Sequence, residues 1–190
     1  IIKNPVSAED TAKINSLIKK GFLSVKESSK GSMKSEKTEL FIDSATLLCE
    51  KNKIDFPPLL HLLKAEFYFI RSDFNTSEQE ARKCIEKAEN SKDHLSQAKG
   101  LIFLGNYYHR TGSFSVSIDN YEKCITLAGE ERLKGIIPSC YLGMARVMRT
   151  IGDLRGESEN YRLLAETALQ ENAEKYVLEA WLSNGGLYLE

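Results

Sequence analysis

The sequence predicts an all-α protein, a solenoid of stacked antiparallel helix pairs, and three observations support this prediction. The chain repeats with a period of 40 residues, since Ser72, Gly112 and Gly152 occupy equivalent turns, and 112 − 72 and 152 − 112 both equal 40. Within each period the apolar residues have the spacing of a helix and not of a strand. A two-residue break, Thr111-Gly112 or Ile151-Gly152, divides the period into two runs. Each period is therefore a helix pair.

The same shift aligns further columns of residues. One column, Ala65, Gly105, Ala145 and Gly185, contains only small side chains. A glycine inside a helix costs about 1 kcal/mol relative to alanine, so Gly105 needs a steric reason. We expect this column to lie where paired helices approach closely. The other columns are Ala88, Ala128 and Ala168; Cys84, Cys124 and Leu164; Ala81, Tyr121 and Tyr161; Tyr68, Tyr108, Met148 and Tyr188; and His61, Leu101, Tyr141 and Trp181.

The elements follow one another from the N-terminus. Residues 1–56 hold two helical patterns, Ala8–Ser28 and Glu36–Lys51, which we expect to form a degenerate pair that caps the stack. Pro57-Pro58 suits the first turn of the next helix. Repeats are predicted at 57–94, 95–134 and 135–174, with helix pairs at about 57–89, 95–129 and 135–171. Residues 175–190 hold the first helix of a fourth repeat whose second helix is missing, so we expect a fragment of a longer array.

Two segments resemble the tetratricopeptide signature W-x2-L-G-x2-Y. Trp181 to Tyr188 matches it with Asn184 replacing leucine, and Leu101 to Tyr108 matches it with leucine replacing tryptophan. The period is 40 instead of the family's length of about 34, and the terminal proline of the family is absent. The resemblance implies a right-handed superhelix whose first helices line a concave groove.

Composition and charge argue against several kinds of partner. The 190 residues carry 26 basic and 27 acidic side chains, a net charge of −1, so we expect no binding to nucleic acid or to a membrane surface. No apolar run approaches the ~18 residues of a membrane span. The four cysteines, Cys49, Cys84, Cys124 and Cys140, are interpreted as buried free thiols, which favours a reducing, cytoplasmic compartment.

Sequence motifs for catalysis and for cofactors are missing. The three histidines have no metal-ligand spacing, no C-x2-C pair occurs, and neither a phosphate-binding glycine loop nor a nucleophile elbow is found. We therefore predict a protein that is not an enzyme and that uses no metal or cofactor.

The groove implied by the resemblance carries basic residues at its middle. Two stripes of residues with helical spacing face this groove. One lies on the helix at 95–110 and includes Ile102, and the other lies on the next first helix and includes Ser139 and Leu142. Glu179 takes a corresponding place in the last unit. Arginine can hold a carboxylate through two hydrogen bonds, so the stripes suit an acidic peptide or a free C-terminal carboxylate. The alternative is a merely solvated face. The candidate peptide-binding residues are Lys99, Asn106, His109, Arg110, Arg146 and Arg149.

These observations predict a non-catalytic interaction module that binds a peptide or protein segment. The alternative is the sensor or regulatory region of a larger bacterial signalling protein, a histidine kinase or a transcription regulator, whose output domain lies outside this chain. Because the last helix lacks a partner, we also expect Trp181, Leu182, Leu187 and Tyr188 to leave an apolar face open. The chain would then self-associate or fray at this end.

Overall fold

The structure, a computed structural model, describes residues 7–28 and 35–184, and for residues 28, 35 and 181–184 it describes the backbone alone. The chain forms two compact units, residues 1–91 and 92–190. All regular elements in the described part of the chain are α-helices, which confirms the predicted fold class.

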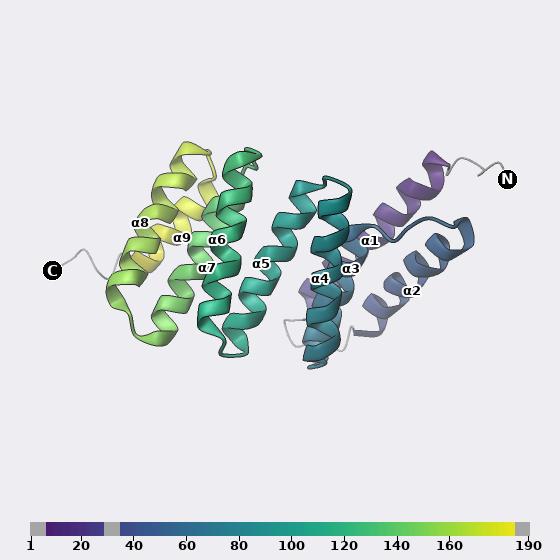
Figure 1. The fold of residues 1–190 in the computed structure, drawn as a ribbon, viewed down its shortest axis with the longest axis horizontal. Coiled ribbons are helices and arrows are strands. Elements are labelled where there is room, and N and C mark those ends of the chain that lie inside the picture. Colours follow the sequence, from purple (N-terminus) through teal and green to yellow (C-terminus); the bar gives the residue numbers. More distant parts are fainter. Residues whose placement is uncertain (1–6, 29–34, 185–190) are drawn as a thin grey trace. The chain divides into compact units, whose positions relative to one another are not determined.

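Unit 1 consists of two antiparallel helix pairs (Figure 1). The first pair is α1 (Ala8–Ser28) with α2 (Ser35–Asn52), and the second is α3 (Pro58–Ile70) with α4 (Phe74–Asn90). Pro58 occupies the first turn of α3, as predicted, because proline lacks the N–H that this turn would leave unpaired. Ile14 and Ile18 of α1 pack with Ala45 and Cys49 of α2 and with Leu60 of α3, so the core runs between the pairs.

Unit 2 contains the next two pairs and one further helix (Figure 1). The pairs are α5 (His94–Arg110) with α6 (Phe114–Glu130) and α7 (Ile136–Ile151) with α8 (Leu154–Gln170), followed by α9 (Glu174–Asn184). Helices α4, α6 and α8 begin 40 residues apart and have 17 residues each. A core cluster formed by Leu142, Ala145, Tyr161, Leu164 and Ala180 joins α7, α8 and α9.

The turns repeat as regularly as the helices. Ser72, Gly112 and Gly152, predicted as turn residues, all have a left-handed backbone, with φ of 63, 83 and 79°. A second set of left-handed residues ends each pair. These are Lys53, Lys92, Arg132 and Asn172, with φ of 53, 56, 54 and 55°. The last three are 40 residues apart, so the backbone repeats with the same period as the side chains.

Gly105 is buried, and the structure supplies the steric reason for it. A Cβ atom at this position would lie 2.6 Å from Cε1 and Cζ of Tyr121 on the paired helix. Tyr121 is fully buried, and a Cβ atom at Gly143 of α7 would lie 2.3 Å from its Cζ. The ring of Tyr121 is therefore accommodated by a glycine on each of two neighbouring helices. This confirms a close approach at Gly105 and adds a contact to the next pair.

The prediction for the cysteines is confirmed, and the one for the C-terminal end stays open. All four cysteines are buried and unbridged, as predicted. Leu187 and Tyr188, and the side chains of Trp181 and Leu182, lie outside the described residues, so the expected open face at this end stays a prediction. None of the described helices combines the length and apolarity that crossing a membrane requires.

Candidate functional site

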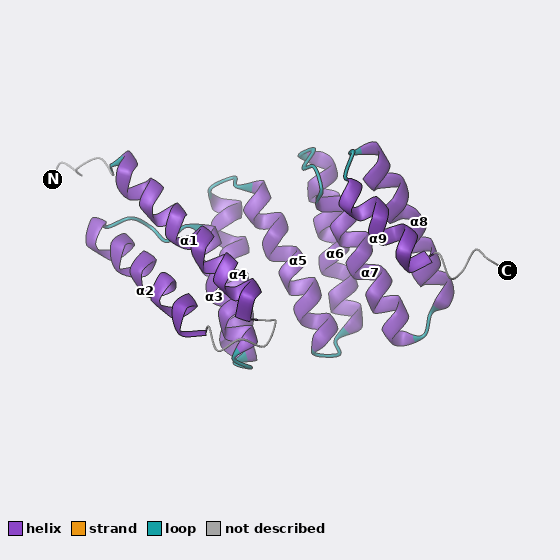
Figure 2. Cartoon of the chain, turned by 180° about the vertical axis from the view of Figure 1, so that it is seen from behind, coloured by secondary structure: helices purple, strands orange, loops and turns teal. Residues whose placement is uncertain are grey.

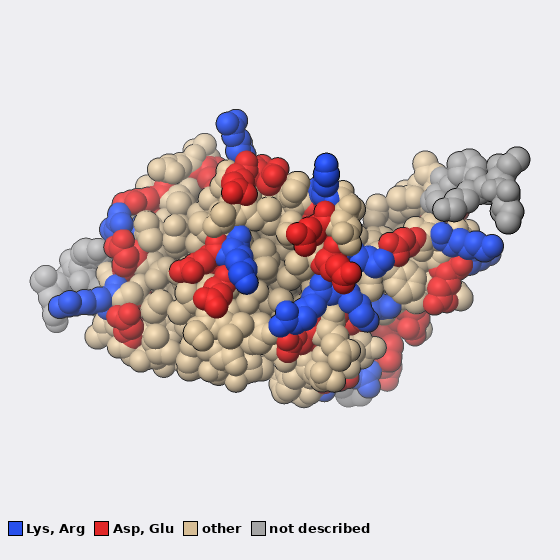
Figure 3. Space-filling model, in the orientation of Figure 1, with Lys and Arg blue, Asp and Glu red and all other residues tan. Residues whose placement is uncertain are grey.

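Charge is distributed unevenly between the helices of unit 2. Helix α5 contains lysine, arginine and histidine, α7 contains two arginines, and neither helix has an aspartate or glutamate. Their paired helices α6 and α8 carry three acidic residues each. On the face of the molecule drawn in Figure 3, by contrast, acidic and basic side chains are interspersed. Helix α7 contacts both α5 and α9, and these three helices lie side by side in Figure 2.

Arg146 lies at the centre of this group of helices. Its side chain is half exposed, and Nη2 donates a hydrogen bond to Glu179 Oε1 of α9 at 2.7 Å. An exposed pair of this kind contributes at most about 1 kcal/mol to stability, so a ligand can replace it at low cost. Glu179 thus occupies the place at which an acidic group of a partner could bind.

His109 of α5 reaches across to α7. Its Nε2 lies 2.8 Å from Thr150 Oγ1, and the Thr150 hydroxyl donates its hydrogen to the carbonyl oxygen of Arg146 at 2.9 Å. Because that hydrogen is already used, His109 Nε2 must be the donor in the first bond. Burial lowers the pKa of His109, and the positive charges of Arg146 and Arg110 lower it further. The structure therefore brings these three predicted residues together, and the neutral form of His109 is favoured. We call His109, Arg110 and Arg146 the basic cluster.

Asn106 is exposed one turn before His109, and two hydrogen bonds within the protein hold its side-chain amide in place. Tyr121 donates its hydroxyl hydrogen to Asn106 Oδ1 at 3.0 Å, and Asn106 Nδ2 donates to the Ile102 carbonyl at 3.0 Å. Burial raises the pKa of Tyr121, which keeps the phenol protonated as this donor. The side chain of Asn106 is consequently held in one orientation beside the basic cluster.

The remaining predicted residues do not join the cluster. Lys99 is half-buried on α5, ten residues or nearly three turns before His109. Arg149 is directed toward α8, where its guanidinium donates to Glu157 Oε1 at 2.6 Å and to the Tyr161 hydroxyl at 3.0 Å. Leu142, expected on the groove side, is instead buried in the core cluster of α7, α8 and α9.

A break in a repeat column explains the position of Arg149. Ser77 and Ser117 are buried and donate their hydroxyl hydrogens to the carbonyl oxygens of Ala65 and Gly105. The equivalent position in α8 is Glu157, which is equally buried but has no hydrogen to donate when ionised. A buried carboxylate needs a charged partner, and Arg149 supplies it. The change from serine to glutamate in this column was the sequence signal that could have revealed the pairing.

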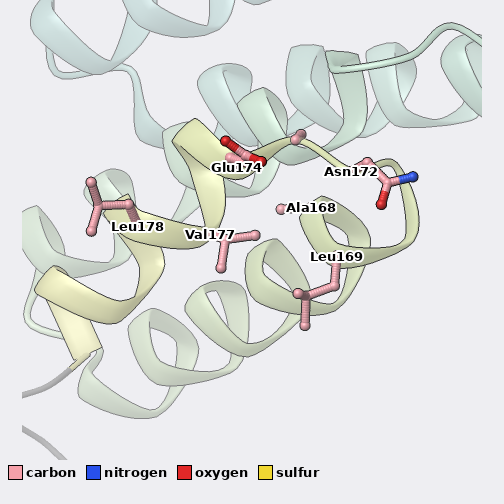
Figure 4. Close-up of a pocket in the computed structure, with 7 residues that line it drawn as sticks. Ala168, Leu169, Asn172, Glu174, Val177 and Leu178 are labelled. Carbon is pink, nitrogen blue, oxygen red and sulfur yellow. The ribbon is translucent and has the colours of Figure 1, made fainter.

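A separate cavity of about 450 Å³ opens at the turn between α8 and α9. Its lining is mostly apolar, and Figure 4 shows Leu169 of α8 and Leu178 of α9 on either side of Val177. Both leucines are more than half exposed. Within the described residues no three metal-ligating side chains are grouped.

The chain has a helical-repeat, solenoid-like fold, because consecutive helix pairs pack against one another and are joined by turns that repeat. A solved structure with the same fold is that of BtubC (BKLC) from P. vanneervenii, with a TM-score of 0.58 and 16% sequence identity. The similarity covers 92% of this chain and 65% of that one, so this chain spans less than two thirds of that protein. At this identity the likeness shows the fold alone. No model of a known protein family matches the sequence, and no curated protein matches it.

Proposed function

We propose that this chain is a divergent tetratricopeptide-like array and a non-catalytic interaction module. Its ligand is a peptide segment that presents an acidic side chain or a C-terminal carboxylate to the basic cluster on α5 and α7. The repeat columns and the signature-like segment Leu101 to Tyr108 support the family assignment. The observation that carries the binding proposal is the half-exposed side chain of Arg146, whose guanidinium is paired with a single replaceable carboxylate, Glu179.

The binding step is an exchange of one carboxylate for another. An incoming carboxylate replaces that of Glu179 and accepts two hydrogen bonds from Arg146, a geometry that favours arginine over lysine. Because α5 and α7 contain no acidic residue, the peptide meets no like charge along these two helices. Asn106, already oriented by Tyr121, gives the surface a fixed shape next to the charge.

A selection from peptides of random sequence tests this proposal. A displayed library of such peptides with free C-termini is selected on the full chain, and the enriched peptides are titrated against the Arg146→Glu variant. We expect enrichment of peptides that are acidic or depend on their terminal carboxylate, and a loss of affinity of at least about tenfold in the variant, which corresponds to ~1.4 kcal/mol.

Arg155→Glu is the matched control, since it makes the same charge change at an exposed arginine in the first turn of α8. Arg149→Glu is unsuitable, because it would leave the buried Glu157 without its partner. If selection enriches no acidic or carboxylate-dependent peptides, or if Arg146→Glu and Arg155→Glu bind them equally, the basic cluster is a solvated face and the proposal fails.

A further inference from the structure

His109 is the member of the basic cluster whose charge can change near neutral pH, since arginine stays protonated. Its ring is partly buried in the last turn of α5. Because the Thr150 hydroxyl donates its hydrogen to the Arg146 carbonyl oxygen, Nε2 of His109 keeps its own hydrogen, and a second proton can bind only at Nδ1. Nδ1 forms no hydrogen bond with any residue that the structure describes. A proton bound there can be donated to a ligand.

The charges that act on His109 are positive. Burial is the largest cause of its lowered pKa, and Arg146 of α7 and Arg110 of its own helix lower that pKa further. Helix α6, which also packs against α5, presents the uncharged ring of Phe114 at 6.1 Å and the protonated phenol of Tyr121, which donates to Asn106. Among the described residues, no carboxylate belongs to the charges that act on His109.

Glu179, the carboxylate that pairs with Arg146, does not supply the missing negative charge. It lies on α9, which contacts α7 and has no contact with α5 in the described part of the chain. Helix α7 lies between α5 and α9 in Figure 2. A ligand carboxylate that binds Arg146 from the side of α5 would therefore bring a negative charge to His109 that Glu179 does not bring.

We propose that the acidic peptide takes up a proton at Nδ1 of His109 when it binds, so that its affinity rises as the pH falls from about 7.5 to about 5.5. This inference rests on the proposed function, because it concerns the regulation of the same site. The ligand carboxylate lies between Arg146 and His109 and accepts hydrogen bonds from the guanidinium and from Nδ1. The peptide and the proton each strengthen the binding of the other.

The direction of the pH dependence is set by the charge of the ligand. The carboxylate raises the pKa of His109 in the complex above its value in the free chain, so the complex binds more protons, and affinity increases as the pH falls between the two values. A pKa raised by about one allows a gain of about tenfold at most. The ligand carboxylate and Glu179 titrate near pH ~4 and the arginines above ~12, so this range reports on histidine.

Isothermal titration calorimetry measures both the affinity and the uptake of protons. One acidic peptide enriched in the selection described above is titrated into the full chain at pH ~5.5, ~6.5 and ~7.5, in buffers that differ in their enthalpy of ionisation. The difference in heat between the buffers gives the number of protons taken up. We expect affinity to rise at least about fivefold from pH ~7.5 to ~5.5, with roughly half a proton taken up per peptide near the middle of the range.

His109→Gln is the key variant, because glutamine keeps an N–H donor for Thr150 and does not titrate. We expect it to bind the peptide at pH ~7.5 within about twofold of wild type and to lose both the pH dependence and the proton uptake. His94→Gln is the matched control, since it removes a histidine at the other end of α5 and should keep both properties.

Nuclear magnetic resonance of the histidine ring nitrogens measures the same step in wild type, and so remains decisive if His109→Gln folds poorly. We expect the Nε2–H tautomer of His109 in the free chain and a higher pKa of His109 when the peptide is bound. A pKa that the peptide leaves unchanged would overturn this inference.

Failure of this inference can be told apart from failure of the proposed function. If Arg146→Glu weakens binding but wild-type affinity is the same at the three pH values, or if His109→Gln keeps the pH dependence, the proton-linked step is wrong and the proposed function stands. If the peptide binds Arg146→Glu as tightly as wild type, both are wrong.

Discussion

Tyr121 determines where glycine is needed in unit 2. Its ring is buried against Gly105 of its own pair and Gly143 of the next, and its hydroxyl orients Asn106. Gly105 could be predicted because the column with Ala65 and Ala145 admits only small residues. Gly143 could not, because the residue one period earlier is Phe103 and no small-residue column marks it. Glycine is required at position 143 by a contact between successive helix pairs, and the sequence of a single repeat does not reveal such a contact.

Replacing Gly105 by alanine tests this contact. Alanine favours the helix by about 1 kcal/mol, but its methyl group would lie 2.6 Å from the Tyr121 ring. We expect a net loss in the free energy of unfolding on the order of 1–3 kcal/mol. Gly129→Ala in α6 is the control, since nothing lies within 4 Å of its Cβ and only the gain in helix propensity should appear. Urea denaturation measures both, and a stabilised Gly105→Ala would contradict the close contact.

In unit 1, the ionisation of Glu80 makes the stability of the fold vary with pH in the acidic range. Burial alone would raise its pKa, but hydrogen bonds from His61 at 2.8 Å and Lys83 at 2.7 Å outweigh burial and lower it from 4.5 to about 2. A carboxyl group whose pKa is lower in the folded state stabilises the fold above the unfolded pKa. This contribution is lost as the pH falls from about 4.5 toward 2.

Glu80→Gln should therefore be less stable than wild type at pH ~6, and the difference should shrink as the pH falls below ~4. Denaturant titrations at a series of pH values measure it, with Glu122→Gln on the exposed side of α6 as the control. Parallel curves for wild type and Glu80→Gln would show that the paired carboxylate does not contribute in this range.

At the level of elements, α4, α6 and α8 each begin after a short turn with a similar backbone. Asp73 and Asp153 cap α4 and α8 by accepting hydrogen bonds from the backbone N–H of Thr76 and Gly156. Ser113 precedes α6 with a similar backbone, φ −89° and ψ 67°, but its side chain forms no capping bond. The α6 N-terminus is thus the weak member of a repeated set.

Ser113→Asp should supply the missing cap by accepting a hydrogen bond from the Val116 N–H. The aspartate also places a negative charge at the helix N-terminus, which is favourable. We expect a total gain of about 0.5–1 kcal/mol in the free energy of unfolding. Asp153→Ala should lose a similar amount and serves as the opposite control. A Ser113→Asp variant with an unchanged melting temperature would show that the existing serine already caps the helix in solution.

The sequence predicted the helices well because period, turns and apolar spacing agree with one another. It predicted the site less completely. Arg146 and Arg149 are one turn apart on α7, so their spacing alone does not predict that Arg149 forms an ion pair with the buried Glu157. The pairing of Arg146 with Glu179 joins side chains 33 residues apart, on successive first helices. Such a contact depends on how neighbouring pairs pack.

At the scale of the whole molecule, the chain consists of two units that the repeat does not reveal. The period and the left-handed turn at Lys92 continue without interruption across the boundary between residues 91 and 92. The proposed binding surface, the basic cluster, lies wholly within unit 2, on α5 and α7.

The most direct test of the central claim is a calorimetric titration of one selected acidic peptide into wild type, Glu179→Gln and Arg146→Glu. If a ligand carboxylate replaces Glu179 on Arg146, removing the internal carboxylate should strengthen binding by a few-fold. Removing the guanidinium should weaken it by at least about tenfold. The account predicts this order, with Glu179→Gln tightest and Arg146→Glu weakest. Equal affinities for the three proteins would contradict it.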